Sequence, residues 1–154
     1  SYKKTYKDIL VDLQKNIADI FIIILILIIP VRFLIGFLRY RWQEAQAKKL
    51  SNNERIIYLY KQILKLTELL GYPQQYGETH YEYANRVAYK FYIHNEKGIK
   101  EITDIFVKSK YSNSPALDED VLDLEMYRNT LKTRLRNHYG PIVYYYRKYV
   151  RQDI

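Results

Sequence analysis

One stretch of sequence decides the fold: Ile20-Phe-Ile-Ile-Ile-Leu-Ile-Leu-Ile-Ile-Pro-Val31, continued by Phe33-Leu-Ile-Gly-Phe-Leu38. A helix that is apolar on every face is not a water-facing helix. From Ile20 to Leu38 such a helix would rise about 28 Å at about 1.5 Å per residue, close to the roughly 30 Å hydrocarbon core of a bilayer. The sequence therefore predicts a transmembrane helix, and every other segment flanks it.

The apolar stretch begins well inside the chain, and no small-residue cleavage site follows it. Because it is also longer than the core of a signal peptide, we interpret it as an anchor and not as a removed leader. Ser1 is compatible with a processed short protein or with a fragment of a longer one. We predict a juxtamembrane arm at 1–16, a transmembrane helix at 17–42, a helical stalk at 43–50, a helical domain at 51–137 and a basic aromatic tail at 138–154.

The net charge of +8 is concentrated at the two ends of the chain. Residues 1–50 carry nine basic and four acidic side chains, residues 51–137 carry thirteen and twelve, and residues 138–154 carry three and one. Anionic headgroups attract a nearby Lys or Arg by about 1 kcal/mol each. Contact with the lipid bilayer therefore explains the charge more simply than nucleic acid does, and we expect no nucleic-acid partner.

Basic and aromatic side chains mark one end of the predicted span. Arg39, Arg41 and Trp42 follow it and are predicted to lie at the membrane interface. Arg32 joins them, because its guanidinium can extend toward the interface, which is roughly 9 Å further along the axis at Leu38; a carboxylate on another helix is the alternative partner. By the positive-inside rule we expect a single-pass protein of the cell membrane with a cytoplasmic C-terminal domain.

The segment 51–137 carries the signals of four helices. Ser51-Asn-Asn-Glu54 and Thr79-His-Tyr-Glu82 have the spacing of capping boxes, which start helices. A third helix is predicted near 97–110, and Asp118–Asp120 places acidic side chains at the favourable end of a fourth. Nothing alternates with period two for long. We therefore predict an all-α fold, with one transmembrane helix, a small soluble bundle of about four helices and a C-terminal amphipathic segment.

The predicted helices each carry one apolar face, which we interpret as core and not as a binding groove. In the second helix this face consists of Tyr83, Ala84, Val87, Ala88 and Phe91.

Gly140-Pro141 separates a basic amphipathic tail from the domain. Wound as a helix, the tail carries an apolar side (Ile142, Val143, Tyr145, Tyr146, Tyr149 and Val150) and an opposite side (Tyr144, Arg147, Lys148 and Arg151). Such a segment can lie on an anionic membrane surface or dock on the domain; we favour docking. Its basic residues, Arg147, Lys148 and Arg151, are candidate contacts for a partner or for the membrane.

The sequence contains no recognisable catalytic, metal or cofactor motif. The absence of cysteine excludes disulfides, thiolate zinc sites and thiol nucleophiles. His80, His94 and His138 lack the spacing of paired metal ligands, and Asp118–Asp120 lacks the glycine turn and distal glutamate of a calcium loop. No glycine-rich phosphate loop or nucleophile elbow is present. We therefore expect no cofactor and no catalysis by this chain.

Three features between Ile56 and Leu135 carry a family resemblance. A helix ends in Leu-Leu-Gly71, the segment Gly77-Glu-Thr-His-Tyr-Glu-Tyr-Ala84 follows, and Lys110-Tyr111 precedes a loop. With these features the region resembles the domain of unknown function that follows the last membrane helix in bacterial transglutaminase-like membrane proteins, whose signature reads Gly-Glu-Thr-Pro-x-Glu-Tyr-Ala. His80 replaces the usual proline. The resemblance implies a cytoplasmic domain and, as partner, a MoxR-type ATPase system or another membrane subunit.

These observations predict a membrane-anchored, non-catalytic cytoplasmic protein-interaction module. Tyr76, Tyr81 and Tyr83 are the exposed aromatic candidates for partner contact. The alternative is a C-terminal fragment of a larger membrane transglutaminase-like enzyme, which a Cys-His-Asp domain encoded in frame upstream of Ser1 would favour. A third hypothesis, nucleic-acid binding by the basic ends, predicts an affinity that falls steeply with salt.

Overall fold

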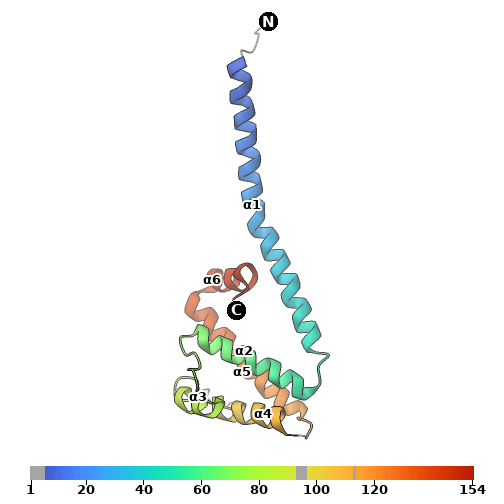
Figure 1. Ribbon diagram of the computed structural model, residues 1–154, viewed down its shortest axis with the longest axis vertical. Helices are drawn as coiled ribbons and strands as arrows, with labels where there is room; N and C mark the ends of the chain where they lie inside the picture. Colours follow the sequence, from blue (N-terminus) through green and yellow to red (C-terminus); the bar gives the residue numbers. More distant parts are fainter. Residues whose placement is uncertain (1–5, 93–96, 113) are drawn as a thin grey trace.

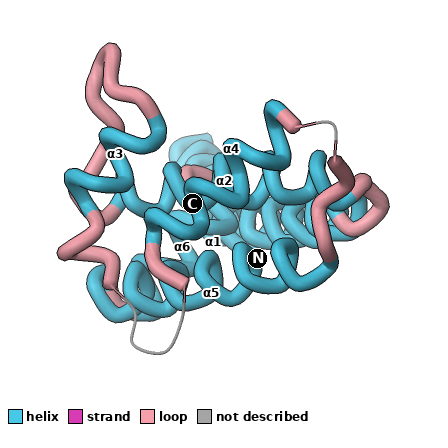
Figure 2. The backbone as a smooth tube through the Cα atoms, turned by 90° about the horizontal axis from the view of Figure 1, so that it is seen from below, coloured by secondary structure: helices cyan, strands magenta, loops and turns pink. Residues whose placement is uncertain are grey.

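In the computed structural model, all regular secondary structure of the described residues, 6–92, 97–112 and 114–154, is helical. The elements are α1 (Tyr6–Ala47), α2 (Asn52–Leu69), α3 (His80–Val87), α4 (Ile99–Tyr111), α5 (Asp118–Tyr139), α6 (Pro141–Tyr146) and the π-helical turn η1 (Arg147–Arg151). Figure 1 shows a long α1 that extends away from a bundle of shorter helices, and Figure 2 shows the turns that join them. The all-α prediction is confirmed.

The helix α1 runs without interruption from the described part of the predicted arm through the predicted span, but it ends at Ala47, within the helical stalk predicted at 43–50. Residues 1–5 of the arm lie outside the described residues. Within the part of the chain that the structure describes, it is the one helix long and apolar enough to cross a membrane. Only 6 % of its most apolar segment is buried within the protein. Its apolar side chains therefore remain available to lipid.

Helices α2 and α3 begin at their predicted capping boxes, of which the box at Thr79 makes both of its hydrogen bonds and the box at Ser51 makes the one to the glutamate side chain. The Ser51 amide and hydroxyl donate to Glu54 Oε2 at 3.0 and 2.7 Å. At the start of α3, Thr79 Oγ1 accepts from the Glu82 amide at 3.2 Å, and the Glu82 carboxylate accepts from the Thr79 amide at 2.8 Å. These local contacts satisfy amides that have no partner within the helix, so each helix starts where its box predicts.

The core of the bundle is centred on α2, which packs against α4 and α5. The predicted apolar face implied that α3 extends to Phe91, but the helix ends at Val87. Phe91 is nevertheless only 2 % exposed: its amide donates to the Val87 carbonyl at 3.2 Å, a bond that spans four residues and continues the turn of the helix. The largest fully buried side chains include three tyrosines: Tyr60, Tyr83 and Tyr127.

Each of these tyrosine hydroxyls has a partner inside the bundle. Tyr60 Oη is 3.0 Å from Thr103 Oγ1, Tyr83 Oη donates to Thr67 Oγ1 at 2.6 Å, and Tyr127 Oη donates to the Phe91 carbonyl at 3.1 Å. Burial raises the pKa of all three, that of Tyr60 to about 12. The buried phenols can therefore stay in the core only while they are neutral.

We expect the bundle to lose stability in alkali. Tyrosine in the unfolded chain ionises near pH 10, below the raised folded pKa, so stability is full below pH 10 and falls as pH rises through about 12. Between pH 9 and pH 11, Tyr60 alone should cost about 1 kcal/mol. Urea unfolding at both values, compared between wild type and Tyr60→Phe, measures this difference. An identical pH dependence in the two proteins would contradict it.

Candidate functional site

A polar cluster lies where α1 meets α5. Tyr40 and Glu44 are one turn apart on α1, and Arg128 and Lys132 are one turn apart on α5, so each pair projects from one face of its helix. Arg128 Nη1 donates to Glu44 Oε1 at 3.0 Å, and Lys132 Nζ donates to Tyr40 Oη at 3.0 Å. These two parallel contacts attach the C-terminal part of α1 to the bundle.

Arg128 is the best buried member of this cluster, with 6 % of its surface exposed. It also donates to Gln62 Oε1 on α2 at 2.7 Å, so one guanidinium joins three helices. Its Nε is buried and has no hydrogen-bond partner among the described residues. Sequence reasoning missed Arg128 and Glu44, because residues 84 positions apart give no local signal of their pairing.

The tail completes the cluster by packing on α1. The ring of Tyr149 makes edge contacts with Phe33 and Phe37, with centroids 4.9 and 5.6 Å apart. Between these two phenylalanines, Gly36 lies so close to the tail that an added Cβ would come within 1.8 Å of the Tyr149 carbonyl oxygen. Lys148 Nζ lies 3.9 Å from the centroid of the Tyr40 ring. The tail therefore docks at the end of the apolar segment of α1.

The cluster contains more positive than negative charge. Arg128, Lys132 and Lys148 face the single carboxylate of Glu44, which is engaged by Arg128. Burial and the neighbouring Arg128 lower the pKa of Lys132 to about 8, and burial also lowers the pKa of Lys148. Both shifts reflect the free-energy cost of holding ammonium groups away from water without enough negative charge nearby.

The predicted faces of the tail are partly wrong. Tyr144, assigned to the basic side, is 4 % exposed, whereas Ile142, assigned to the apolar side, is 84 % exposed. Tyr149 and Val150 are buried as predicted. Ile142 and Tyr144 both lie in α6, which packs against α5 and places Tyr144 in the core of the bundle. The π-helical η1 departs from the regular 100° spacing only after α6, from Arg147 on.

The basic residues of the tail are largely engaged within the protein. Arg147 pairs with Asp153 at 3.1 Å and lies 4.5 Å from the centroid of the Tyr139 ring. Arg151 reaches the same carboxylate at 3.3 Å but stays exposed. Together with Lys148 over Tyr40, these contacts leave Arg151 as the tail cation most open to an outside partner.

The residues predicted for the membrane interface are all exposed. Arg32, Arg39, Arg41 and Trp42 point outward from α1, and Trp42 is 63 % exposed. Arg39 Nη1 also donates to Gln152 Oε1 at 3.3 Å, a further contact between α1 and the tail.

The three tyrosines proposed for partner contact fall into two groups. Tyr76 is fully exposed, and Tyr81 is 45 % exposed and donates to Asp104 Oδ1 at 3.1 Å. Tyr83 is fully buried, so its prediction as an exposed contact was wrong. Its place on the apolar face of α3 puts it in the core, and its hydroxyl is satisfied there by Thr67.

The structure does not bring the described histidines together. His80 is partly buried beside the rings of Tyr60 and Phe106, whereas His138 is exposed and lies against Tyr139. His94 lies outside the described residues. Within the described ranges, no group of three His, Asp or Glu side chains is placed to hold a metal.

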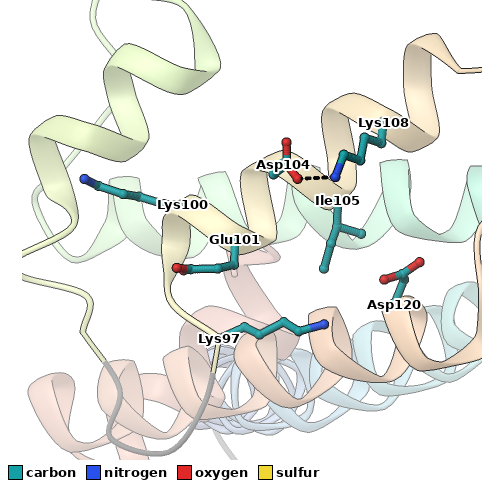
Figure 3. Close-up of a pocket in the computed structure, with 7 residues that line it drawn as sticks. All are labelled: Lys97, Lys100, Glu101, Asp104, Ile105, Lys108 and Asp120. Carbon is teal, nitrogen blue, oxygen red and sulfur yellow. Dashed lines mark ion pairs between the residues drawn. The ribbon is translucent and has the colours of Figure 1, made fainter.

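A second candidate is the groove between α4 and the start of α5, with a volume of about 460 Å³. Figure 3 shows acidic and basic side chains intermingled around it, with Ile105 between them. Asp104 pairs with Lys108 at 2.6 Å, and Lys97 pairs with Asp123. Since basic and acidic side chains alternate around this open groove, it lacks a concentrated charge of one sign that would activate or bind a substrate.

The fold and the cluster define an all-α chain with one candidate membrane span whose C-terminal part is attached to a helical bundle. No protein-family model, curated protein or solved structure matches this chain.

Proposed function

We propose that this protein is a membrane-anchored, non-catalytic interaction module whose helical bundle lies on the cytoplasmic side of the cell membrane. One observation carries the proposal: the apolar part of α1 is exposed, while its next turns are attached to the bundle through Glu44–Arg128 and Tyr40–Lys132. A lipid-embedded α1 would therefore hold the bundle in a fixed position beside the bilayer.

The surface that would meet a partner is the end of the bundle that carries α3. This end lies away from the N-terminal half of α1 (Figure 1), and it presents Tyr76 and Tyr81 to solvent. Exposed aromatic side chains supply much of the binding energy in protein interfaces. The family resemblance suggests a MoxR-type ATPase system or another membrane subunit as the protein that binds there.

Sidedness is the first test of this proposal. Because the chain has no cysteine, Ser112→Cys in the exposed turn after α4 and Lys7→Cys near the other end of α1 each introduce a single thiol. A membrane-impermeant maleimide should label Lys7→Cys on intact cells and Ser112→Cys only after lysis. Labelling of Ser112→Cys on intact cells would overturn the cytoplasmic orientation.

Partner contact is tested by photo-crosslinking in intact cells. A photoreactive phenylalanine in place of Tyr76 should give one discrete crosslinked product, because Tyr76 is fully exposed at the proposed contact surface. The same group in place of Lys61, an exposed residue of α2, serves as the control and should give none. A chain that gives no discrete product from Tyr76 would contradict the role as an interaction module.

A further inference from the structure

A small pocket opens within the polar cluster described above. It has a volume of about 60 Å³, and its lining combines polar and apolar residues: Tyr40 from α1, Gln62, Lys65 and Leu66 from α2, Lys132 from α5, Lys148 from η1, and Ile154. A water molecule needs about 10–15 Å³ of such space. The pocket therefore has room for about four oxygen-sized atoms, the number in a phosphate group.

The charged side chains that line this pocket are all lysines. One of them, Lys65, is already paired with Glu68, which leaves Lys132 and Lys148. The other carboxylates nearby are engaged by arginines: Glu44 with Arg128, and Asp153 with Arg147 and Arg151. An ammonium group held away from water without a counter-charge costs free energy. The pocket thus has the charge that an oxyanion would compensate.

Hydrogen-bond donors around the pocket also lack acceptors. The ammonium of Lys148 contacts the faces of Tyr40, Tyr144 and Tyr149, and no acceptor in the described part of the chain hydrogen-bonds to it. Arg128 does not line the pocket itself, but it donates to Gln62, which does, and its buried Nε has no hydrogen-bond partner among the described residues. Cationic N–H donors to phosphate oxygens form strong, charge-assisted hydrogen bonds.

The position of the pocket along α1 indicates the source of such an anion. Tyr40 lies two residues beyond Leu38, the last residue of the apolar stretch. Two residues beyond Tyr40, Trp42 is 63 % exposed, as expected of an aromatic side chain that inserts at a membrane interface. If α1 spans the bilayer, the pocket lies at the depth of the lipid headgroups.

We propose that the pocket between Tyr40, Lys132 and Lys148 binds the phosphate group of an anionic phospholipid. The lipid fills a site that the tail completes, so that it joins α1, α5 and η1. This proposal rests on the membrane-anchored part of the proposed function, and it is independent of any protein partner.

Lipid binding to the full chain in uncharged detergent micelles tests the site. Phosphatidylglycerol should raise the midpoint of thermal unfolding, and titration gives its dissociation constant. The double variant Lys132→Gln/Lys148→Gln should bind the lipid roughly thirtyfold more weakly, since each lysine near an anionic headgroup contributes about a factor of five. Lys132→Arg/Lys148→Arg keeps the charge and should retain binding.

The matched control removes the same charge elsewhere. Lys61→Gln/Lys100→Gln changes two exposed lysines outside the pocket and should bind like wild type. If both double glutamine variants bound phosphatidylglycerol equally weakly, the effect would be a general attraction to positive charge and the site would be overturned. A wild-type protein whose unfolding midpoint does not change with the lipid would overturn it as well. If the lysine pair merely supported the fold, its glutamine variant would unfold earlier with or without lipid.

Inorganic phosphate, titrated in parallel, distinguishes a site for the phosphate group of a lipid from a site for free phosphate in solution. A shift with phosphatidylglycerol but not with phosphate supports a lipid headgroup, whereas an equal shift with phosphate that Lys132→Gln/Lys148→Gln abolishes supports a phosphate site filled from solution. Because these measurements use purified protein, a failure here is separable from a failure of the labelling or crosslinking experiments in cells.

Discussion

Replacing Arg128 with methionine should lower the free energy of unfolding by about 3 kcal/mol. Methionine fills much of the same volume but leaves Glu44 and Gln62 without the donor they share. Removing one partner of a buried ion pair leaves the other charge uncompensated, which costs more than the pair itself contributes. Thermal and urea unfolding of the full chain in detergent micelles measures the loss.

A double-mutant cycle separates the pairing from the loss of packing. If the two charges are coupled, Arg128→Met combined with Glu44→Gln should cost at least about 1 kcal/mol less than the sum of the single variants, because neither charge is left alone. Arg136→Met, at an exposed site on the same helix, is the matched control and should change stability little. Strict additivity of the two single effects would show that the ion pair does not hold α1 against α5.

The parts of the fold that follow from local chemistry could be predicted from the sequence. Capping boxes act over three residues, so Ser51–Glu54 and Thr79–Glu82 fix the starts of α2 and α3 without help from the rest of the chain. The apolar content of α1 likewise depends on composition alone. The all-α architecture needed no long-range information beyond these signals.

The candidate site could not be predicted in the same way, because it consists of contacts between distant segments. Arg128 appears in the sequence as one of several basic residues on an amphipathic helix, and only the fold places it beside Glu44. The alternatives for Tyr83 were both present in the sequence: its helical face indicated core, and its position in the Gly-Glu-Thr segment suggested a contact surface. In the structure Tyr83 is fully buried, so the interpretation as a core residue is the correct one.

The residues through which the tail contacts α1 could not be predicted from the sequence either. Docking of the tail was the favoured alternative, but the residues that face α1 depend on the π-helical turn, which shifts the register between Tyr144 and Tyr149. Gly36 carried no signal at all, because a glycine within an apolar helix reads as a small lipid-facing residue. Its role appears only with the tail in place.

Replacing Gly36 with alanine should detach the tail from α1. The new Cβ would meet the Tyr149 carbonyl oxygen at 1.8 Å and its carbonyl carbon at 2.7 Å, and backbone atoms cannot move aside as a flexible side chain can. Alanine favours a helix over glycine by about 1 kcal/mol, so α1 itself should be no less stable. Hydrogen exchange of the amides in 141–151 should become about tenfold faster or more, while exchange in α2 and α5 stays unchanged.

The neighbouring substitution Ile35→Ala controls for a general change in the surface of α1. Ile35 is 55 % exposed and the change only removes side-chain atoms, so exchange in the tail should remain that of wild type. Unchanged protection of 141–151 in Gly36→Ala would contradict the close packing of the tail against this helix.

Detachment of the tail has a second consequence, because it withdraws Lys148 from the pocket while leaving Lys132 in place. Gly36→Ala should therefore also weaken phosphatidylglycerol binding, although it changes no charge, which links the geometry of the tail to the anion site.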